Sequence, residues 1–242
     1  MLSESLLFIL PFFLVALFYA SVGHGGASGY LATMILLSVE SDLIRPTALL
    51  LNVLVSLVGT IAFFKAGHFR LGLFLPLSVA AIPFAYWGGS IDLNKDFFRQ
   101  ILALALCFAL LRLFMTLKKS DQIKKPHLII LLLTGALIGF VSGLIGVGGG
   151  IFLTPLVILL AWATPRTAAA ISAPFIFFNS LAGLAGLRPS IENFHPYTLL
   201  LTCAVIIAGY LGAKWGSQIA TELTIRTALG CVLFFAALKL CL

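Results

Sequence analysis

Apolar stretches of 16 to 22 residues, separated by short polar segments, follow one another along almost the whole chain. They occupy residues 43–64, 71–89 and 97–117 in the first half of the sequence and residues 167–186, 197–212 and 223–240 in the second. A helix that crosses a bilayer needs about 20 apolar residues, and the bilayer core holds no water to satisfy an open backbone. The pattern therefore predicts an all-α polytopic membrane protein with three transmembrane helices of this kind in each half.

Each half also begins with an apolar stretch that is interrupted by glycines. Residues 16–37, ALFYASVGHGGASGYLATMILL, align with residues 139–160, GFVSGLIGVGGGIFLTPLVILL, at an offset of 123. The glycines that coincide are Gly23, Gly25 and Gly26 in the first copy and Gly146, Gly148 and Gly149 in the second. Three later pairs of segments match in the same order at offsets of 120, 124 and 127. This order predicts two homologous transmembrane repeats, residues 1–117 and 128–242, joined by a basic linker at 118–127.

The length of the second interrupted stretch indicates how it crosses the membrane. Leu128 to Ala163 comprises 36 residues, about 54 Å as a helix, which exceeds one crossing of roughly 30 Å and falls short of two. A hairpin with the glycines at its bend fits this length better than a single kinked helix. Each half would then cross an odd number of times, so that the halves would be inverted repeats with about 8 to 10 membrane segments in total.

The basic residues of the loops do not decide between four and five passes in each half. With the linker on the cytoplasmic side, five passes place ten of the fifteen Lys and Arg residues there, and four passes place nine. The inverted arrangement is therefore an expectation from length alone.

Composition agrees with a membrane protein and narrows the choice of partners. The 242 residues are 61% hydrophobic and 10% charged, and their mean hydropathy is +1.15, far above that of ordinary soluble domains. The net charge of +7 comes from basic residues in short loops, which orient a membrane protein with those loops in the cytoplasm. We therefore expect a cytoplasmic linker and no nucleic-acid partner.

The residue patterns of common catalytic and metal sites are missing. The four cysteines form no CxxC pair, and they are Cys107, Cys203, Cys231 and Cys241. No pairing of a nucleophile with a base is recognisable, and no carboxylate lies within a glycine-interrupted segment to neutralise a metal cation. We expect a protein that is not an enzyme and that uses no metal or cofactor.

The glycine clusters predict helix breaks inside the membrane. Helices that resume near Ser28 and Ile151 would each point a positive N-terminal end into the bilayer, and the glycines would let an anion approach the backbone. Neither segment contains Lys, Arg, Asp or Glu, so that partial charges would hold the anion weakly enough for release. The pattern favours a site for a small oxyanion. Close helix packing is the alternative, and we expect it for Gly139 and Gly143.

Polar side chains at and after the breaks complete the candidate site. His24 would donate a hydrogen bond to the anion or carry a proton, and the alternative is a neutral histidine bonded to a nearby carbonyl. Polar residues on the following helices would line the cavity or bond neighbouring helices. The candidate substrate-binding residues are Gly23, His24, Gly25, Gly26, Ser28, Asn52, Gly146, Gly148, Gly149, Gly150, Ser172 and Asn179.

These segments resemble a known family. GLIGVGGGIFLTPLVILL followed by TPRTAAAISAPFIFFNSLAG, together with the weaker first copy SVGHGGASGYLATMILL, resembles the sulfite exporter TauE/SafE family, also called the TSUP family. The resemblance covers essentially the whole chain. It implies a multi-pass inner-membrane transporter of sulfur-containing anions such as sulfite or organosulfonates. In the first copy, Ala27 and Ala32 stand where the second has Gly150 and Pro155, which leaves open whether both halves contact the substrate equally.

Our leading hypothesis is export of a small sulfur oxyanion by alternating access, with the anion bound between the two glycine breaks. A passive anion channel is the alternative, because it would use the same kind of site. The candidate partners are the bilayer, the anion, a coupling proton or sodium ion, and a second copy of the chain in a homodimer.

Overall fold

The computed structural model describes residues 2–65, 67–94, 97, 98, 100, 101, 103, 104, 107 and 123–218. Among these residues there are no strands, and the α-helices are α1 (Leu2–Ser21), α2 (Ala27–Leu36), α3 (Ser41–Lys65), α4 (Leu71–Gly89), α6 (Leu128–Ile145), α7 (Gly150–Leu159), α8 (Pro165–Leu187) and α9 (Thr198–Gln218). A short 3-10 helix, η1, spans Ile191–Asn193. The helices predicted at 97–117 and 223–240 lie, apart from seven residues of the first, outside the described residues.

Five of the described helices, α3, α4, α6, α8 and α9, are long and apolar enough to cross a membrane. The shorter apolar helices are α2, α7 and the part of α1 from Phe8 to Ser21. The prediction of an all-helical, polytopic membrane protein is thereby confirmed. The total of 8 to 10 membrane segments and the inverted repeat stay predictions.

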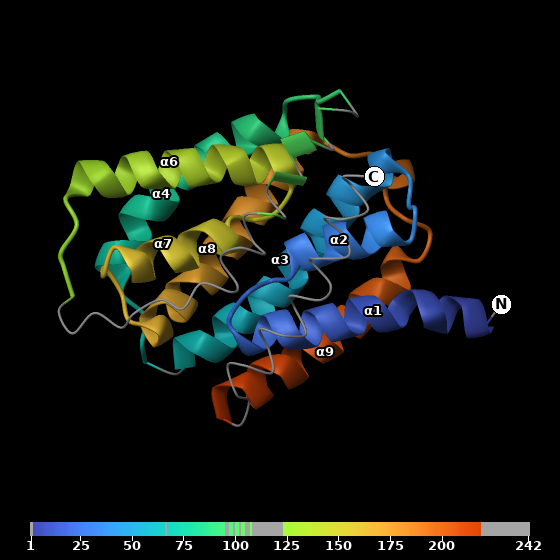
Figure 1. Cartoon of the computed structure of the whole chain (residues 1–242), viewed down its shortest axis with the longest axis horizontal. Coiled ribbons are helices and arrows are strands. Elements are labelled where there is room, and N and C mark those ends of the chain that lie inside the picture. Colours follow the sequence, from blue (N-terminus) through green and yellow to red (C-terminus); the bar gives the residue numbers. More distant parts are fainter. Residues whose placement is uncertain are drawn as a thin grey trace.

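Helices α3 and α8 form the centre of the bundle. In the most apolar window of α8, 72% of the residues are buried, and in that of α3, 50%, against 33–39% for the other three long helices. The helices α6, α4, α8, α3, α9 and α1 follow one another across the molecule (Figure 1). The short helix α2 packs on α3, and α7 packs on α8. The two short helices therefore lie against the two most buried ones.

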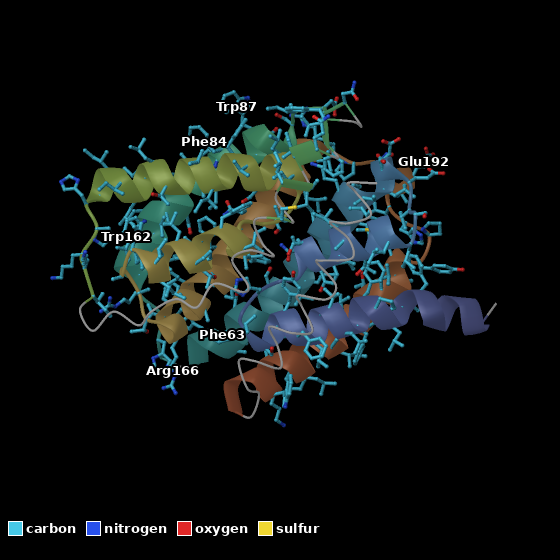
Figure 2. All side chains as sticks on the ribbon, viewed as in Figure 1. Phe63, Phe84, Trp87, Trp162, Arg166 and Glu192 are labelled. Atoms are coloured by element: carbon cyan, nitrogen blue, oxygen red, sulfur yellow. The ribbon has the colours of Figure 1, made fainter. Side chains whose placement is uncertain are left out.

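The outer surface is apolar along the bundle and charged at its ends. Phe84 and Trp87 of α4 project away from the helices (Figure 2), and Trp87 and Leu137 are 56% and 66% exposed. Arg166 and Glu192 lie at opposite ends of the long axis. An apolar belt between two charged ends is the surface that a bilayer requires.

Glycines let α4 and α6 approach within backbone contact. Gly135, Gly139 and Gly143 of α6 face the carbonyl oxygens of Leu77, Ala81 and Ala85 of α4, in that order, with no room for a Cβ atom. Small residues at four-residue spacing are the usual device for close packing of membrane helices. The packing role expected for Gly139 and Gly143 is thereby confirmed.

We expect Gly139→Leu to weaken this interface severely. The leucine would force α6 away from Ala81, and overpacking of this kind costs roughly 1–3 kcal/mol of unfolding free energy or more. The thermal unfolding midpoint in detergent should fall by several degrees. Gly72→Ala is the matched control, because an added Cβ there has nothing within 4 Å. An unchanged midpoint for Gly139→Leu would contradict the packing described.

Candidate functional site

The first helix break separates α1 from α2. The chain leaves α1 after Ser21, and the backbone NH of His24 donates to the carbonyl oxygen of Tyr19 at 2.9 Å. Gly23 and Gly26 have φ of +76° and +101°, a region that side chains disfavour. Gly26 is the N-cap residue of α2 and has no side chain with which to cap that helix. Glycine is therefore needed at both positions, and a side-chain cap for the N-terminal end of α2 has to come from elsewhere in the protein.

The second break separates α6 from α7 with similar local geometry. Gly146, Gly148 and Gly149 have φ of +86°, +70° and +87°, and Gly149 is the uncapped N-cap residue of α7. The backbone NH of Lys124 donates to the carbonyl oxygen of Ala161 at 2.8 Å, so that the chain before α6 meets the chain after α7. The predicted hairpin is thereby confirmed. Ten-residue α7 spans only about 15 Å, half of the hydrocarbon core.

Asn52 of α3 joins the first break to the second half of the chain. Its Oδ1 accepts a hydrogen bond from the backbone NH of Ala27 at 3.0 Å, and its Nδ2 donates to Ser180 Oγ at 2.7 Å. The Asn52 side chain is only 1% exposed. The first N–H group of α2 and a hydroxyl of α8 are thus held by one amide.

The two breaks meet around this amide. A Cβ atom on Gly25 would collide with Asn52 Oδ1, and one on Gly148 would collide with Asn52 Nδ2. A Cβ atom on Gly150, the first residue of α7, would lie 3.2 Å from Cδ2 of His24. The amide of Asn52 therefore lies between one glycine of each break, and the starts of α2 and α7 contribute to one site.

Asn179 is a buried polar side chain whose hydrogen bonds are not satisfied. It is 1% exposed, and neither Nδ2 nor Oδ1 has a hydrogen-bond partner among the described residues. It precedes Ser180 and lies one helical turn after Ile176, whose side chain contacts Gly148 and Gly150. Buried polar groups are nearly always hydrogen-bonded, so an unpaired amide at such a place is a candidate contact for a ligand.

Several other candidate residues bond within the protein. Ser28 Oγ and Tyr19 Oη are 2.8 Å apart, and Ser172 Oγ lies 2.8 Å from Thr154 Oγ1. These pairs link α2 to α1 and α7 to α8. Nδ1 of His24 lies 3.1 Å from the carbonyl oxygen of Val22, which is the local bond that the alternative role of His24 implies.

The remaining candidate glycines flank the meeting point. A Cβ atom on Gly23 would lie 3.0 Å from Cβ of Ala169 in α8, and the same atom on Gly149 would lie 2.9 Å from the ring of Phe175. The structure therefore gathers Gly25, His24, Asn52, Gly148 and Gly150 most closely, with Asn179 nearby. A Cβ atom on Gly26 would meet the side chain of Tyr30, and one on Gly146 would meet the side chain of Arg45. Ser28 and Ser172 lie at interhelical hydrogen bonds.

Arg45 is an important residue that the sequence analysis did not single out. This side chain of α3 is 7% exposed, and its Nη2 donates to the carbonyl oxygens of Gly88, Gly89 and Gly143 at 3.0, 3.0 and 2.8 Å. Its Nη1 donates to the carbonyl oxygen of Ile91 at 3.2 Å. A cation thereby satisfies the C-terminal carbonyls of α4 and of α6, where helix dipoles are negative. The one sequence signal was its place inside the apolar stretch at 43–64.

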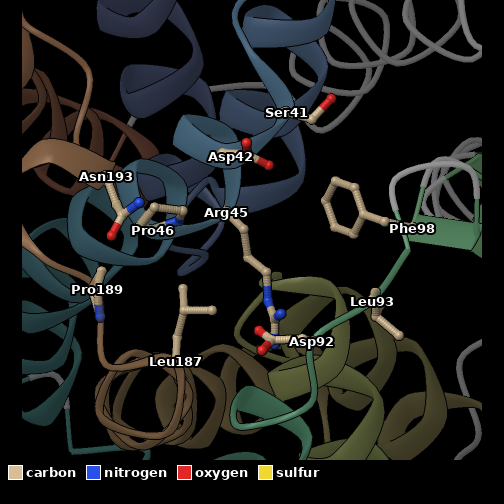
Figure 3. Close-up of a pocket in the computed structure, with 10 residues that line it drawn as sticks. All are labelled: Ser41, Asp42, Arg45, Pro46, Asp92, Leu93, Phe98, Leu187, Pro189 and Asn193. Atoms are coloured by element: carbon tan, nitrogen blue, oxygen red, sulfur yellow. The ribbon is translucent and has the colours of Figure 1, made fainter.

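A cavity of about 260 Å³ lies next to Arg45, at the N-terminal end of α3 (Figure 3). It is lined by Ser41, Asp42, Arg45, Pro46, Asp92, Leu93, Phe98, Leu187, Pro189 and Asn193. The lining carries two carboxylates, those of Asp42 and Asp92, against one guanidinium, and that guanidinium already donates to four carbonyls. The cavity is therefore a poor place for an anion, and the helix breaks are a better one.

We expect Arg45→Met to destabilise the fold. Three buried carbonyl groups and the partly buried carbonyl of Ile91 would lose their donor, and each unsatisfied buried group costs about 1–3 kcal/mol. The unfolding midpoint in detergent should fall, and Arg45→Lys should recover only part of it, because one ammonium cannot reproduce the planar fork of guanidinium donors. Equal midpoints for wild type and Arg45→Met would show that these hydrogen bonds do not hold α4 and α6.

Comparison with known proteins places the chain in a family. A family profile described as Sulfite exporter TauE/SafE matches residues 8–240. The probable membrane transporter protein y4hK of Sinorhizobium fredii (strain NBRC 101917 / NGR234) is 37% identical over 246 residues, which cover 98% of both chains. No solved structure shows a significant match. The match of the profile over nearly the whole length, together with the paired glycine breaks, shows that the chain belongs to the sulfite exporter TauE/SafE family.

Proposed function

We propose that this membrane transporter exports a small sulfur oxyanion, sulfite or an organosulfonate, across the inner membrane by alternating access. The observation that carries the proposal is the meeting of the two helix breaks around the Asn52 amide. Family membership supports a sulfur anion as the substrate. The anion would bind beside Gly25 and Gly148, where the first turns of α2 and α7 come together.

The chemistry of this place suits an anion that must also be released. The N-terminal ends of α2 and α7 carry partial positive charge, and glycine leaves their backbones accessible. The amide of Asn179 would supply a further N–H donor, one without a partner among the residues that the structure describes. Full positive charges are missing from both break segments, so that binding would be weak enough for turnover.

The directions of the two hairpins support inverted halves. In Figure 1, α1 begins on the right and α2 returns to the right, whereas α6 begins on the left and α7 returns to the left. Two hairpins that enter from opposite ends would present their short helices to a common midpoint, as in transporters with inverted repeats. Rocking of one half against the other would then expose the site to each side in turn.

The distribution of charge supports an orientation in the membrane. Arg166 lies at the left end of the bundle (Figure 2). Lys124 lies there too, because its backbone NH donates a hydrogen bond to the carbonyl oxygen of Ala161, which directly precedes the labelled Trp162. Glu192 lies at the opposite end. By the positive-inside rule, the end with Lys124 and Arg166 would face the cytoplasm.

His24 is our candidate for coupling to protons. It is partly buried at the meeting point, 3.2 Å from the position of a Cβ atom on Gly150. An imidazole changes its charge near neutral pH, and a protonated ring beside the anion would offset one of its negative charges while the site changes sides. Coupling to sodium through carbonyls exposed at the breaks is the alternative.

The test is sulfite flux into proteoliposomes that contain the purified protein. Sulfate and thiosulfate serve as competitors, and the measurement is made with and without an imposed pH gradient. We expect saturable sulfite flux, and exchange of external for internal sulfite. A response to the pH gradient would support coupling through His24, and His24→Gln should then abolish that response.

Other outcomes would contradict parts of the proposal. Flux that rises linearly with concentration, without exchange, would favour the passive anion channel. Flux of none of the three anions would remove inorganic sulfur oxyanions from the proposal and direct the search to larger organosulfonates.

A further inference from the structure

A second buried polar group without a partner lies at the first helix break. The side chain of Tyr30 in α2 is completely buried, and its hydroxyl has no hydrogen-bond partner in the part of the chain that the structure describes. Its ring stacks on that of Phe12 in α1, with 6.0 Å between the ring centroids. Stacking explains why the ring is there, but burial of an unpaired hydroxyl destabilises the protein. A phenylalanine would serve the packing better.

The hydroxyl lies at the N-terminal end of α2. Side chains on a helix lean toward its N-terminus, so that the phenol of Tyr30 covers the first turn. A Cβ atom on Gly26, the N-cap residue, would lie 2.8 Å from the Tyr30 hydroxyl oxygen. The backbone NH of Ala27 is occupied by Asn52. The hydroxyl is therefore a neutral donor beside the N-terminal end of α2, where an anion is favoured.

Neighbouring residues show that buried hydroxyls of this region do not generally lack a hydrogen-bond partner. Tyr19, on the adjacent helix α1, has a partner for its hydroxyl, because its Oη lies 2.8 Å from Ser28 Oγ. At the offset of 123 that relates the two breaks, Tyr30 corresponds to Leu153, which has no hydrogen-bonding side chain. Only the first break therefore offers a phenol at this place.

We infer that the Tyr30 hydroxyl donates a hydrogen bond to the anion bound at the first break. The inference rests on the proposed function and adds a substrate contact from α2. The phenol stays protonated at neutral pH, so that it acts as a donor throughout the working range. It also makes the site asymmetric, since the first half supplies a hydroxyl donor where the second half supplies an apolar side chain.

The test compares Tyr30→Phe with the wild type. Removal of an unpaired hydroxyl should leave the thermal unfolding midpoint of the purified protein unchanged or higher. A hydrogen bond to a charged ligand is lost, however, so the sulfite concentration for half-maximal flux in proteoliposomes should rise about tenfold or more. The rise in the midpoint that saturating sulfite gives the wild type should shrink in parallel.

Tyr19→Phe is the matched control. It removes one phenol hydroxyl from the same region, but one that has a partner, so that the unfolding midpoint should fall while the half-saturating sulfite concentration changes less than about twofold. A comparable loss of affinity in both variants would show a general disturbance of α1 and α2, and would overturn the inference.

Two further results would overturn it. If Tyr30→Phe transports sulfite with wild-type affinity, or if it does not fold, the hydroxyl has another role, and the proposed function is unaffected. If the wild type neither transports nor is stabilised by sulfite, sulfate or thiosulfate, the proposed function for inorganic anions fails together with this inference.

Discussion

Gly25→Ala should reduce sulfite transport by roughly 100-fold while leaving a folded protein, because displacement of a binding group by about 1 Å costs that much. The added methyl group would collide with Asn52 Oδ1. The amide would have to move, and the loss of its bonds to Ala27 and to Ser180 should also lower the unfolding midpoint, although the protein stays folded. The measurement is initial flux in proteoliposomes, with the unfolding midpoint of the same preparation.

Gly25 is a better choice than Gly148 for this test. Gly148 has φ of +70°, so that alanine there would also strain the backbone. A loss of flux could then not be assigned to the site rather than to misfolding. Gly25 is not among the residues with positive φ. Gly59→Ala is the control, since its added Cβ would lie at an ordinary 3.6 Å from Cβ of Ala173, where α3 meets α8. Normal flux in Gly25→Ala would contradict the proposed site.

Asn179→Leu should abolish transport and yet stabilise the protein. Leucine has a similar volume, and it would remove two buried polar atoms that have no partner. Because an unsatisfied buried group costs about 1–3 kcal/mol, the unfolding midpoint should stay the same or rise. Transport should be lost because the amide that the anion requires is gone. Both quantities can be measured on one purified sample.

Asn52→Leu provides the contrast. Asn52 makes both of its hydrogen bonds within the protein, so its replacement should lower the unfolding midpoint as well as the flux. If Asn179→Leu also lowered the midpoint, or if it transported sulfite normally, the unpaired amide would not be a substrate contact.

Much of the fold could be predicted from the sequence because the bilayer imposes strict lengths. The stretches at 71–89 and 167–186 became α4 and α8 almost without change. The hairpin of α6 and α7 followed from the length of Leu128 to Ala163 and from the glycines at its middle. Both predictions depend on local pattern alone, which is where sequence reasoning is strongest.

The contacts of the site could be predicted only in part. Asn52 and Asn179 were candidates because they are polar residues in apolar helices, but the bond of Asn52 to Ser180 spans 128 positions of the sequence. Arg45 was missed because its four acceptors are backbone carbonyls, which carry no sequence signal. The Tyr30 hydroxyl was missed because lack of a partner is a property of the packed protein.

The central claim is that the anion binds where the two breaks meet, and anomalous diffraction from crystals grown with selenite would test it most directly. Selenite is an oxyanion of the shape of sulfite, and selenium can be located by its anomalous signal. We predict one selenium peak between Gly25 and Gly148, with the selenite oxygens within hydrogen-bonding distance of the Asn179 amide. A peak in the cavity beside Arg45 instead, from a protein that transports selenite, would contradict the account.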